Sequence, residues 1–395
     1  MVDSTGKSDA GVRSGKRAES LERDRLRDAI EITLVPGMGN TLQGRLRSVC
    51  GDPSAAFSLD CASMEAVGIP HEACTAITSR RYRPMADEIV DWGTRGGCQF
   101  VCRGSPEYPP LLEQIFDPPS VLYVRGNLKA FQKSCISIVG TRRPTYYGLQ
   151  MAEGLAGDLA RRGIAIVSGL ARGIDASAHR GCLGANGSTI AVFGCGVDIT
   201  YPGEHRRLAE EILREGMVVS EFAPGTSPAP QNFPVRNRII SGLSLGTIIV
   251  EASEYSGSLI TARLAMEQNR EIFALPGNVT SPQSFGPNYL IKQGAKLVQS
   301  WRDVVEELPP ELRRSILAKE EANARHVPEL EVLSLEEMSL LELISFDQAT
   351  QFDKIYTKSG IEISRLSSLM LDLEMRGWLR QVPGNLYVRV YRPKR

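Results

Sequence analysis

The sequence predicts an α/β protein with a doubly wound parallel sheet at its centre. Apolar runs of strand length alternate with helical patterns between residues 130 and 300. The first run, at 136–139, is followed by leucines and alanines at helical spacing. Two of the runs end in glycine-containing turns that lead into helices. Such alternation is typical of a parallel sheet covered by helices on both faces, whose ligand crevice lies at the carboxyl ends of the strands.

The apolar runs give the expected strands of this sheet. Six of them should be central, at 136–139, 164–167, 189–193, 217–219, 247–250 and 272–275. Two further strand-like segments, at 99–102 and 121–124, are separated by two proline pairs. Because proline is tolerated mainly at strand ends and sheet edges, we expect these two segments to extend the sheet at one edge.

Helical segments flank the sheet region on both sides. Residues 22 to about 80 are interrupted by glycine-containing turns at 35–39 and 67–70. Such turns occur in DNA-binding helix-hairpin-helix elements and in ordinary helix connections, and the absence of Lys and Arg from both turns favours an ordinary connection. Beyond a charged, proline-containing stretch at 301–334, three helices at 335–344, 352–358 and 363–375 and a hairpin at 379–390 predict a winged helix.

The expected domains follow from these patterns. They are a disordered start over 1–21, a helical SAM-like or helix-hairpin-helix-like domain over 22–85, the sheet domain over 86–308, a helical or loose linker over 309–334 and a winged-helix domain over 335–395. The last helix of the winged helix carries acidic as well as basic residues, which favours a packing or protein-contact role over insertion into duplex DNA. The basic tail at 392–395 either contacts nucleic acid or makes no contact at all.

Composition excludes several classes of protein. The 46 basic and 46 acidic residues cancel, so any nucleic-acid contact has to be a local patch. Eight cysteines without a CxxC pair and only four histidines argue against a metal site and favour free thiols in a reducing compartment. The first 20 residues lack the apolar segment of a signal peptide, and no stretch is long enough to span a bilayer. We therefore expect a cytoplasmic protein without a membrane partner.

Arginines lie inside the two glycine turns of the expected crevice. Arg142 belongs to the turn at 140–144, and Arg172 to the turn at 168–173. Arg236 and Arg238 lie in a third segment, before the strand expected at 247–250. Helix N-termini offer unpaired N–H groups to anions, so these turns predict an anion-binding crevice for a phosphodiester backbone. Pairing with protein carboxylates such as Asp175, Glu221 or Glu251 is the alternative for each arginine.

An aromatic residue and a hydroxyl-rich loop are expected at the same edge. Phe233 lies in a proline-flanked polar segment without helix or strand periodicity, so it is a candidate for stacking with the bases of a single strand. A core anchor for the loop is the alternative. The segment 256–261 opens a helix with serine and threonine hydroxyls, which suit phosphate binding.

A nucleotide site has weaker support. The turn at 140–148 does not match GxGxxG, and no GxxxxGK[ST] sequence is present. Glu251, at a strand end beside the serine-rich loop, would be the acid or base of a nucleotide hydrolase of similar topology. We keep such a nucleotide-binding or nucleotide-hydrolysing enzyme as the alternative function.

The ordered motifs of this region resemble the DNA-processing protein A (DprA, also called Smf) family. The resemblance is carried by GTRR at 140–143, YG at 147–148, SGLARGID at 168–175, YP at 201–202, SE at 220–221, FPVRNRIIS at 233–241, SGSLITAR at 256–263 and ALPG at 274–277. It implies an extended Rossmann-like fold that binds single-stranded DNA without sequence preference, with no nucleotide cofactor and no enzymatic activity. It also implies a homodimer that passes DNA to the RecA recombinase during natural transformation.

The resemblance also assigns roles to particular residues. The family's phosphate-contacting arginine corresponds to Arg142, its basic residue in the second turn to Arg172, and its stacking aromatic to Phe233. Some relatives carry a basic residue where this chain has Pro230, which shifts weight to Arg236 and Arg238. The full expected DNA-binding set is Gly140, Thr141, Arg142, Arg143, Ser168, Gly169, Arg172, Gly173, Phe233, Arg236, Asn237, Arg238, Ser256, Gly257, Ser258 and Thr261.

Overall fold

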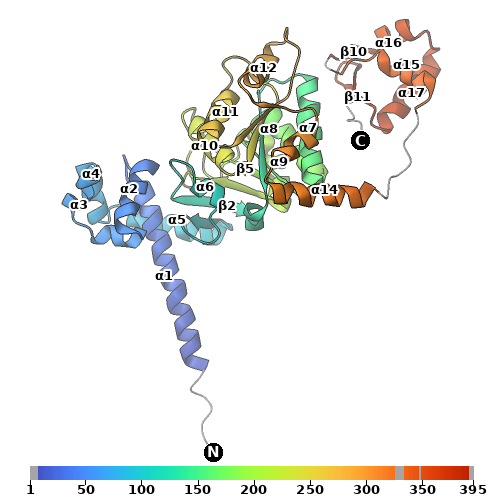
Figure 1. The fold of residues 1–395 in the computed structure, drawn as a ribbon. Coiled ribbons are helices and arrows are strands. Elements are labelled where there is room, and N and C mark those ends of the chain that lie inside the picture. The colour runs from blue at the N-terminus through green and yellow to red at the C-terminus, as the bar shows by residue number, and fades with distance from the viewer. Residues whose placement is uncertain (1–7, 325–332, 347, 391–395) are drawn as a thin grey trace, which may run out of the picture.

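A twisted sheet forms the centre of the molecule in the computed structural model, which describes residues 8–324, 333–346 and 348–390 (Figure 1). The strand order is β1-β2-β6-β5-β4-β3-β7-β8-β9. Strands β3 to β9 run parallel to one another, while β2 is antiparallel to both β1 and β6. The strands are β1 (Gln99–Cys102), β2 (Val121–Gly126), β3 (Cys135–Val139), β4 (Ala165–Ser168), β5 (Thr189–Val192), β6 (Met217–Ser220), β7 (Gly246–Ile249), β8 (Glu271–Ala274) and β9 (Lys296–Leu297).

All eight expected strands of the sheet are present, within one or two residues of their expected bounds. The two proline-flanked segments form β1 and β2 and extend the sheet at one edge, as predicted. The short β9 was not predicted, and it forms the other edge. Because β4 pairs with one side of β3 and β7 with the other, the strand order reverses at β3 and the sheet is doubly wound.

Helices cover both faces of the sheet. Alternate residues of each strand supply two layers of core, as in Ile138 and Val139 of β3. One face packs against α7 (Tyr146–Arg161), α8 (Ile174–Gly184), α9 (Arg206–Glu215), α13 (Trp301–Glu306) and α14 (Pro310–Ala324). The other packs against α6 (Pro110–Glu113), α10 (Asn232–Gly242), α11 (Gly257–Glu267) and α12 (Phe285–Lys292).

The N-terminal region is helical, as expected. It contains α1 (Ser8–Leu34), α2 (Asn40–Cys50), α3 (Cys61–Ala66), α4 (His71–Thr78) and α5 (Arg83–Gly96). Gly37 has φ 82° and Gly68 has φ 86°, so both connecting turns need glycine for their backbone geometry. Helices α2 to α4 enclose a core of their own, whereas α1 and α5 place Ile30 and Val90 against the sheet domain.

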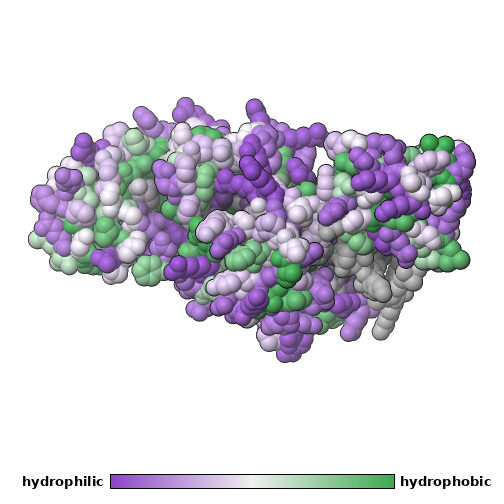
Figure 2. Space-filling model, turned by 90° about the horizontal axis from the view of Figure 1, so that it is seen from above, coloured by the Kyte–Doolittle hydropathy of each residue, from purple (hydrophilic) through white to green (hydrophobic). Residues whose placement is uncertain are grey.

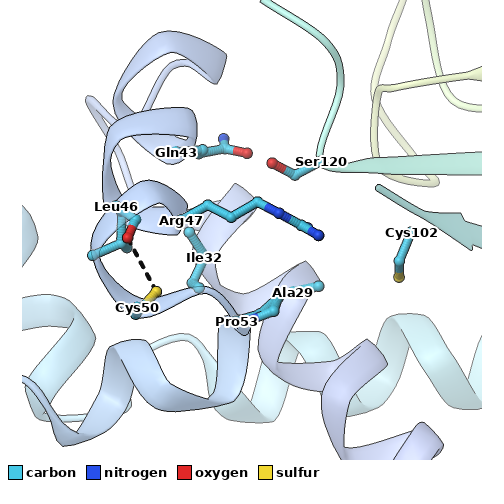
Figure 3. Close-up of a pocket in the computed structure, with 9 residues that line it drawn as sticks. All are labelled: Ala29, Ile32, Gln43, Leu46, Arg47, Cys50, Pro53, Cys102 and Ser120. Atoms are coloured by element: carbon cyan, nitrogen blue, oxygen red, sulfur yellow. Dashed lines mark hydrogen bonds between the residues drawn. The ribbon is translucent and has the colours of Figure 1, made fainter. Parts of the chain in front are cut away.

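Two polar contacts join α2 to the sheet domain. Nη1 of Arg47 donates to the carbonyl oxygen of Arg103 at 2.7 Å, and Figure 3 shows the Arg47 side chain extending from α2 toward the sheet domain. Nδ2 of Asn40 donates to Oε2 of Glu221 at 2.9 Å. The first contact joins α2 to the residue that follows β1, at the antiparallel edge of the sheet. The second joins α2 to the loop that follows β6.

Three expected boundaries need correction. Helix α1 begins at Ser8, so the disorder predicted over 1–21 is wrong from that residue onward. The boundary expected at 85/86 falls inside α5. The linker expected over 309–334 is a packed helix, α14, as far as Ala324, because Ile316 is 3% exposed in the sheet-domain core.

The C-terminal region is a winged helix, as predicted. Its elements are α15 (Leu335–Glu342), β10 (Thr350–Gln351), α16 (Phe352–Ser359), α17 (Ile363–Met375), β11 (Leu379–Val382) and β12 (Leu386–Arg389). Arg365 of α17 pairs with Glu336 at 2.7 Å, and Arg376 pairs with Glu337 at 2.5 Å. Both arginines are therefore paired within the winged helix itself. The basic tail at 392–395 lies outside the described residues.

Candidate nucleic-acid interface

The turn after β3 is fixed by the neighbouring strand. The backbone N–H of Thr141 donates to the carbonyl oxygen of Glu251 at 2.7 Å, just beyond β7. A Cβ on Gly140 would come within 2.6 Å of Ile174, so only glycine fits there. The side chains of Arg142 and Arg143 are both exposed on this turn. The turn therefore presents two arginines at a defined place on the sheet edge.

The turn after β4 is held by buried polar groups. The carboxylate of Asp175, at the start of α8, accepts hydrogen bonds from the backbone N–H groups of Gly169 (3.1 Å) and Ala171 (3.3 Å). Leu170 has φ 55°, a left-handed conformation that is unusual for a leucine, and Nδ1 of His205 donates to its carbonyl oxygen at 2.9 Å. Two amides of this turn are thus already used inside the protein, while the Arg172 side chain stays exposed.

Arg236 contacts the same turn from the interior of the protein. It is 4% exposed, and its Nη1 donates to the carbonyl oxygens of Gly169 (2.8 Å) and Val192. Burial lowers the pKa of Arg236 to about 10, with Asp175 opposing that shift, so the guanidinium is charged at neutral pH. A Cβ on Gly169 would meet the guanidinium at 2.4 Å, which explains the glycine at this position. Arg236 is therefore mainly a structural cation whose edge reaches the surface pocket.

These turns enclose a pocket at the carboxyl edge of the sheet. Phe233, in the first turn of α10, forms its aromatic wall together with Tyr201, with ring centroids 5.5 Å apart. The guanidinium carbon of Arg142 lies over the Phe233 ring, 5.4 Å from its centroid. The residues that line the pocket are Arg142, Gly169, Ala171, Arg172, Tyr201, Pro202, Phe233 and Arg236. Exposed cations beside an aromatic surface suit a ligand with phosphates and planar bases.

The structure does not bring Arg238 into this pocket. Arg238 is 5% exposed and forms ion pairs with Asp117 (3.1 Å) and Glu221 (2.5 Å). The carboxylate alternative therefore holds for this arginine, because a buried guanidinium needs an anionic partner. Asn237 accepts a hydrogen bond from Nε of Arg236 at 3.3 Å and is not part of the pocket lining.

The serine-rich loop is also separate from this pocket. It follows β7, on the far side of β3 from β4. Ser256 caps α11 by accepting from the N–H of Ser258, and the two hydroxyl oxygens lie 2.8 Å apart.

Ser168 is buried and donates to the carbonyl oxygen of Ile138 at 2.6 Å. Of the expected set, the lining omits Gly140, Thr141, Arg143, Ser168, Gly173, Asn237, Arg238, Ser256, Gly257, Ser258 and Thr261.

Glu251 occupies the place where a nucleotide phosphate would bind in a fold of this class. Its two carboxylate oxygens accept from the backbone N–H of Thr145 at 2.9 Å and from the Thr145 hydroxyl at 2.5 Å. Thr145 is the N-cap of α7, the helix that follows the first central strand. Burial raises the pKa of Glu251, against the lowering effect of the Thr145 hydrogen bonds. An internal carboxylate therefore takes the anion position at this helix N-terminus.

Four residues of this region are absent from the expected set. Ala171, in the turn after β4, lines the pocket together with Tyr201 and Pro202, and Glu204 pairs with Arg172 through two bonds of 2.7 Å. The last three lie in the segment after β5, which ends at the same sheet edge as the two arginine turns. An aromatic residue beyond a strand's carboxyl end was a usable signal for Tyr201. No sequence signal indicated Glu204, because its partner Arg172 is distant in sequence.

A second cavity, drawn in Figure 3, lies between α1, α2 and the start of the sheet domain. It is lined mainly by residues of α1 and α2, together with Cys102 and Ser120 of the sheet domain. Among the described residues, no group of His, Cys, Asp and Glu is arranged to hold a metal ion, and no helix is long and apolar enough to cross a membrane. The eight cysteines are free thiols.

Comparison with known proteins agrees with this architecture. The family model for DNA recombination-mediator protein A matches residues 99–309, and the model for the DprA winged helix domain matches residues 324–385. Protein Smf of Escherichia coli K12 is 39% identical over 334 residues, which are 83% of this chain and 88% of that protein. DNA processing protein DprA of Bacillus subtilis is 48% identical over 58% of this chain and 77% of its own. The X-ray structure of DprA from Streptococcus pneumoniae superimposes with a TM-score of 0.64 at 33% identity, over 71% of this chain and 96% of that one.

Proposed function

Because the chain belongs to the DNA recombination-mediator protein A (DprA) family, we propose that it binds single-stranded DNA without sequence preference and loads RecA recombinase onto it. The process is the handling of incoming DNA during natural transformation and DNA processing. The relatives that match this chain over most of their length are named for DNA processing or as Smf proteins. The pocket at the sheet edge is the proposed contact site.

One observation carries this proposal: an unpaired cation lies beside an accessible aromatic ring. Within the described ranges no ion pair joins Arg142 to a carboxylate, and Phe233 is half-buried in the pocket wall. A phosphodiester backbone supplies the anion and unstacked bases supply the planar surface. Duplex DNA hides its bases from such a wall, so the proposal specifies single strands.

The proposal is tested by fluorescence anisotropy with a labelled oligo-dT over a range of salt concentrations. The full chain should bind with micromolar or tighter affinity that weakens with salt. Phe233→Ala should weaken binding by about 1–3 kcal/mol through loss of base stacking. Arg142→Ala should weaken binding and flatten the salt dependence by about 0.7 in slope, the share of one phosphate contact on a single strand.

The matched control is Arg263→Ala, which removes another exposed arginine, from α11, that is paired with Glu267 at 3.0 Å and lies outside the pocket lining. It should bind like the unaltered chain. Binding that survives both Arg142→Ala and Arg172→Ala would refute the proposed site.

A non-catalytic role is part of this proposal. Glu251, the carboxylate of the alternative hydrolase, is engaged on both oxygens by Thr145, which supports a structural use. A nucleotide would have to displace this contact to reach the N-terminus of α7. Incubation with nucleoside monophosphates, followed by chromatography for released base, checks this; turnover that depends on Glu251 would reinstate the hydrolase.

The proposed partners are a second copy of the chain and RecA, in the cytoplasm. A second copy is supported by an exposed apolar group at the β9 edge of the sheet: Phe285 and Tyr289 of α12 stack with centroids 6.2 Å apart, and Val279 is 88% exposed. On the face shown in Figure 2, hydrophobic residues form small groups among hydrophilic ones. Sedimentation of the full chain and of Tyr289→Glu distinguishes a dimer formed through this group from a monomer.

A further inference from the structure

Arg172 is held by a carboxylate in the same way that it would hold a phosphate. Its Nε and Nη2 donate to the two carboxylate oxygens of Glu204, each at 2.7 Å. This two-bond arrangement uses the edge of the guanidinium that recognises phosphate oxygens. Both side chains are exposed, at 60% and 52%, so the pair is accessible to a competing anion from solvent.

The backbone around Glu204 is anchored, so the carboxylate stands at a fixed place beside the pocket. Pro202, two residues earlier, is buried and lines the pocket. His205, the next residue, is buried and bonds to the Leu170 carbonyl in the turn that carries Arg172. The hydrogen bonds from Arg172 lower the pKa of Glu204, which keeps its carboxylate ionised at neutral pH.

The aromatic wall of the pocket is also contacted by a side chain of the protein itself. The Arg142 guanidinium lies over the ring of Phe233, on a surface that a base would use. In the free protein both DNA-facing groups are therefore engaged by internal substitutes: a carboxylate for a phosphate, and a guanidinium for a base.

We propose that Glu204 is an internal competitor of the DNA backbone, which pairs with Arg172 in the free protein and is displaced when a strand binds. This inference rests on the proposed function of the pocket. Displacement leaves an unpaired carboxylate close to the bound strand, which opposes binding. Glu204 therefore lowers the affinity for single strands and also reduces the salt dependence, because Arg172 exchanges one anionic partner for another.

The test is oligo-dT titration of Glu204→Gln by fluorescence anisotropy at several salt concentrations. Removal of the competitor should lower the Kd about two- to five-fold at low salt, the range expected from an exposed ion pair. The salt dependence should become steeper, by up to about 0.7 in slope for one released phosphate contact on a single strand. A purely structural role for Glu204 would not steepen the slope.

Two comparisons make the test specific. Glu210→Gln removes a similarly exposed carboxylate from α9, paired with Arg206 at 3.4 Å and outside the pocket lining, and should leave the Kd unchanged. In an Arg172→Ala background, Glu204→Gln should give no gain in affinity, because the group that it releases is absent.

Unchanged or weaker binding by Glu204→Gln overturns the inference, because Glu204 would then be neutral or would position Arg172 for DNA. A gain that persists without Arg172 overturns it too, since it would report general charge repulsion. These results leave the proposed function intact when the unaltered chain binds and Arg142→Ala weakens it. Failure of the unaltered chain to bind oligo-dT refutes the proposed function, and this inference with it.

Discussion

Individual arginines of this chain have opposite uses that their sequence context does not distinguish. Arg142 is exposed, without an ion pair in the described ranges, and lies over Phe233. Arg238, five residues after that ring, is buried between Asp117 and Glu221. Glu221 also accepts from Asn40 of α2, so Arg238 is part of a joint between the N-terminal helices and the sheet domain. Burial, rather than residue type, decides which arginine can face DNA.

Replacement of Arg238 by alanine should therefore destabilise the fold. The change leaves a buried carboxylate on Glu221 without its cation, and loss of one member of a buried pair costs about 3–5 kcal/mol. Urea denaturation at neutral pH measures the free energy of unfolding. Arg142→Ala, at an exposed position, should change it by less than about 0.5 kcal/mol. Equal stability of the two variants would contradict this assignment.

Among the elements, the two arginine turns act as one unit. Gly173, the N-cap of α8, has φ 77°, and a Cβ there would lie 2.5 Å from the carbonyl oxygen of Thr141 in the other turn. The backbone N–H of Ile174 donates to the same oxygen at 3.4 Å. The glycine permits this close approach, so the positions of Arg142 and Arg172 depend on each other.

Gly173→Ala should separate the two turns. It combines a left-handed backbone angle with a direct clash against backbone, so it should lower the free energy of unfolding by at least about 1 kcal/mol and weaken oligonucleotide binding. Gly154→Ala in α7 is the matched control, because a Cβ there meets nothing within 4 Å. That change should stabilise the protein by about 0.5–1 kcal/mol and leave binding unchanged. Thermal unfolding and anisotropy measure both effects.

At the level of the whole molecule, α14 belongs to the sheet domain rather than to a linker. Ile316 is buried in the core beneath α7, and Glu320 pairs with Arg162 at 2.7 Å. The Arg162 guanidinium in turn lies 3.4 Å from the centroid of the Trp301 ring. Figure 1 shows α14 alongside the sheet domain, with the winged helix beyond it. The winged helix touches α7 through a 3.1 Å hydrogen bond from Gln150 to the Arg389 carbonyl.

Two truncations test this division. A chain that ends at residue 324 should keep the unfolding midpoint of the sheet domain and its oligonucleotide binding, because α14 and the pocket are intact. A chain that ends at residue 309 should lose at least about 2 kcal/mol of unfolding free energy, the contribution of one large buried aliphatic side chain such as Ile316. Identical midpoints would show that α14 is a dispensable linker after all.

Much of the fold was predictable because it depends on local patterns. The strands of the sheet and the three helices of the winged helix have hydrophobic periods that tertiary contacts reinforce. The errors lie where a contact distant in sequence decides. Helix α14 packs against the sheet domain instead of serving as a linker, because the core receives Ile316. The segment at Phe233 is helical from Asn232 although its sequence shows no helical period.

By itself the sequence determined the doubly wound sheet, the two arginine turns and their place at one edge, because strand order and glycine geometry follow from local chemistry. Only the tertiary structure decided how each polar group is used. It placed Arg238 and the Ser256 loop outside the pocket, added Tyr201 to the pocket wall and paired Arg172 with Glu204. The physical reason is that burial and partner choice set the availability of a charge, and both depend on residues brought together by folding.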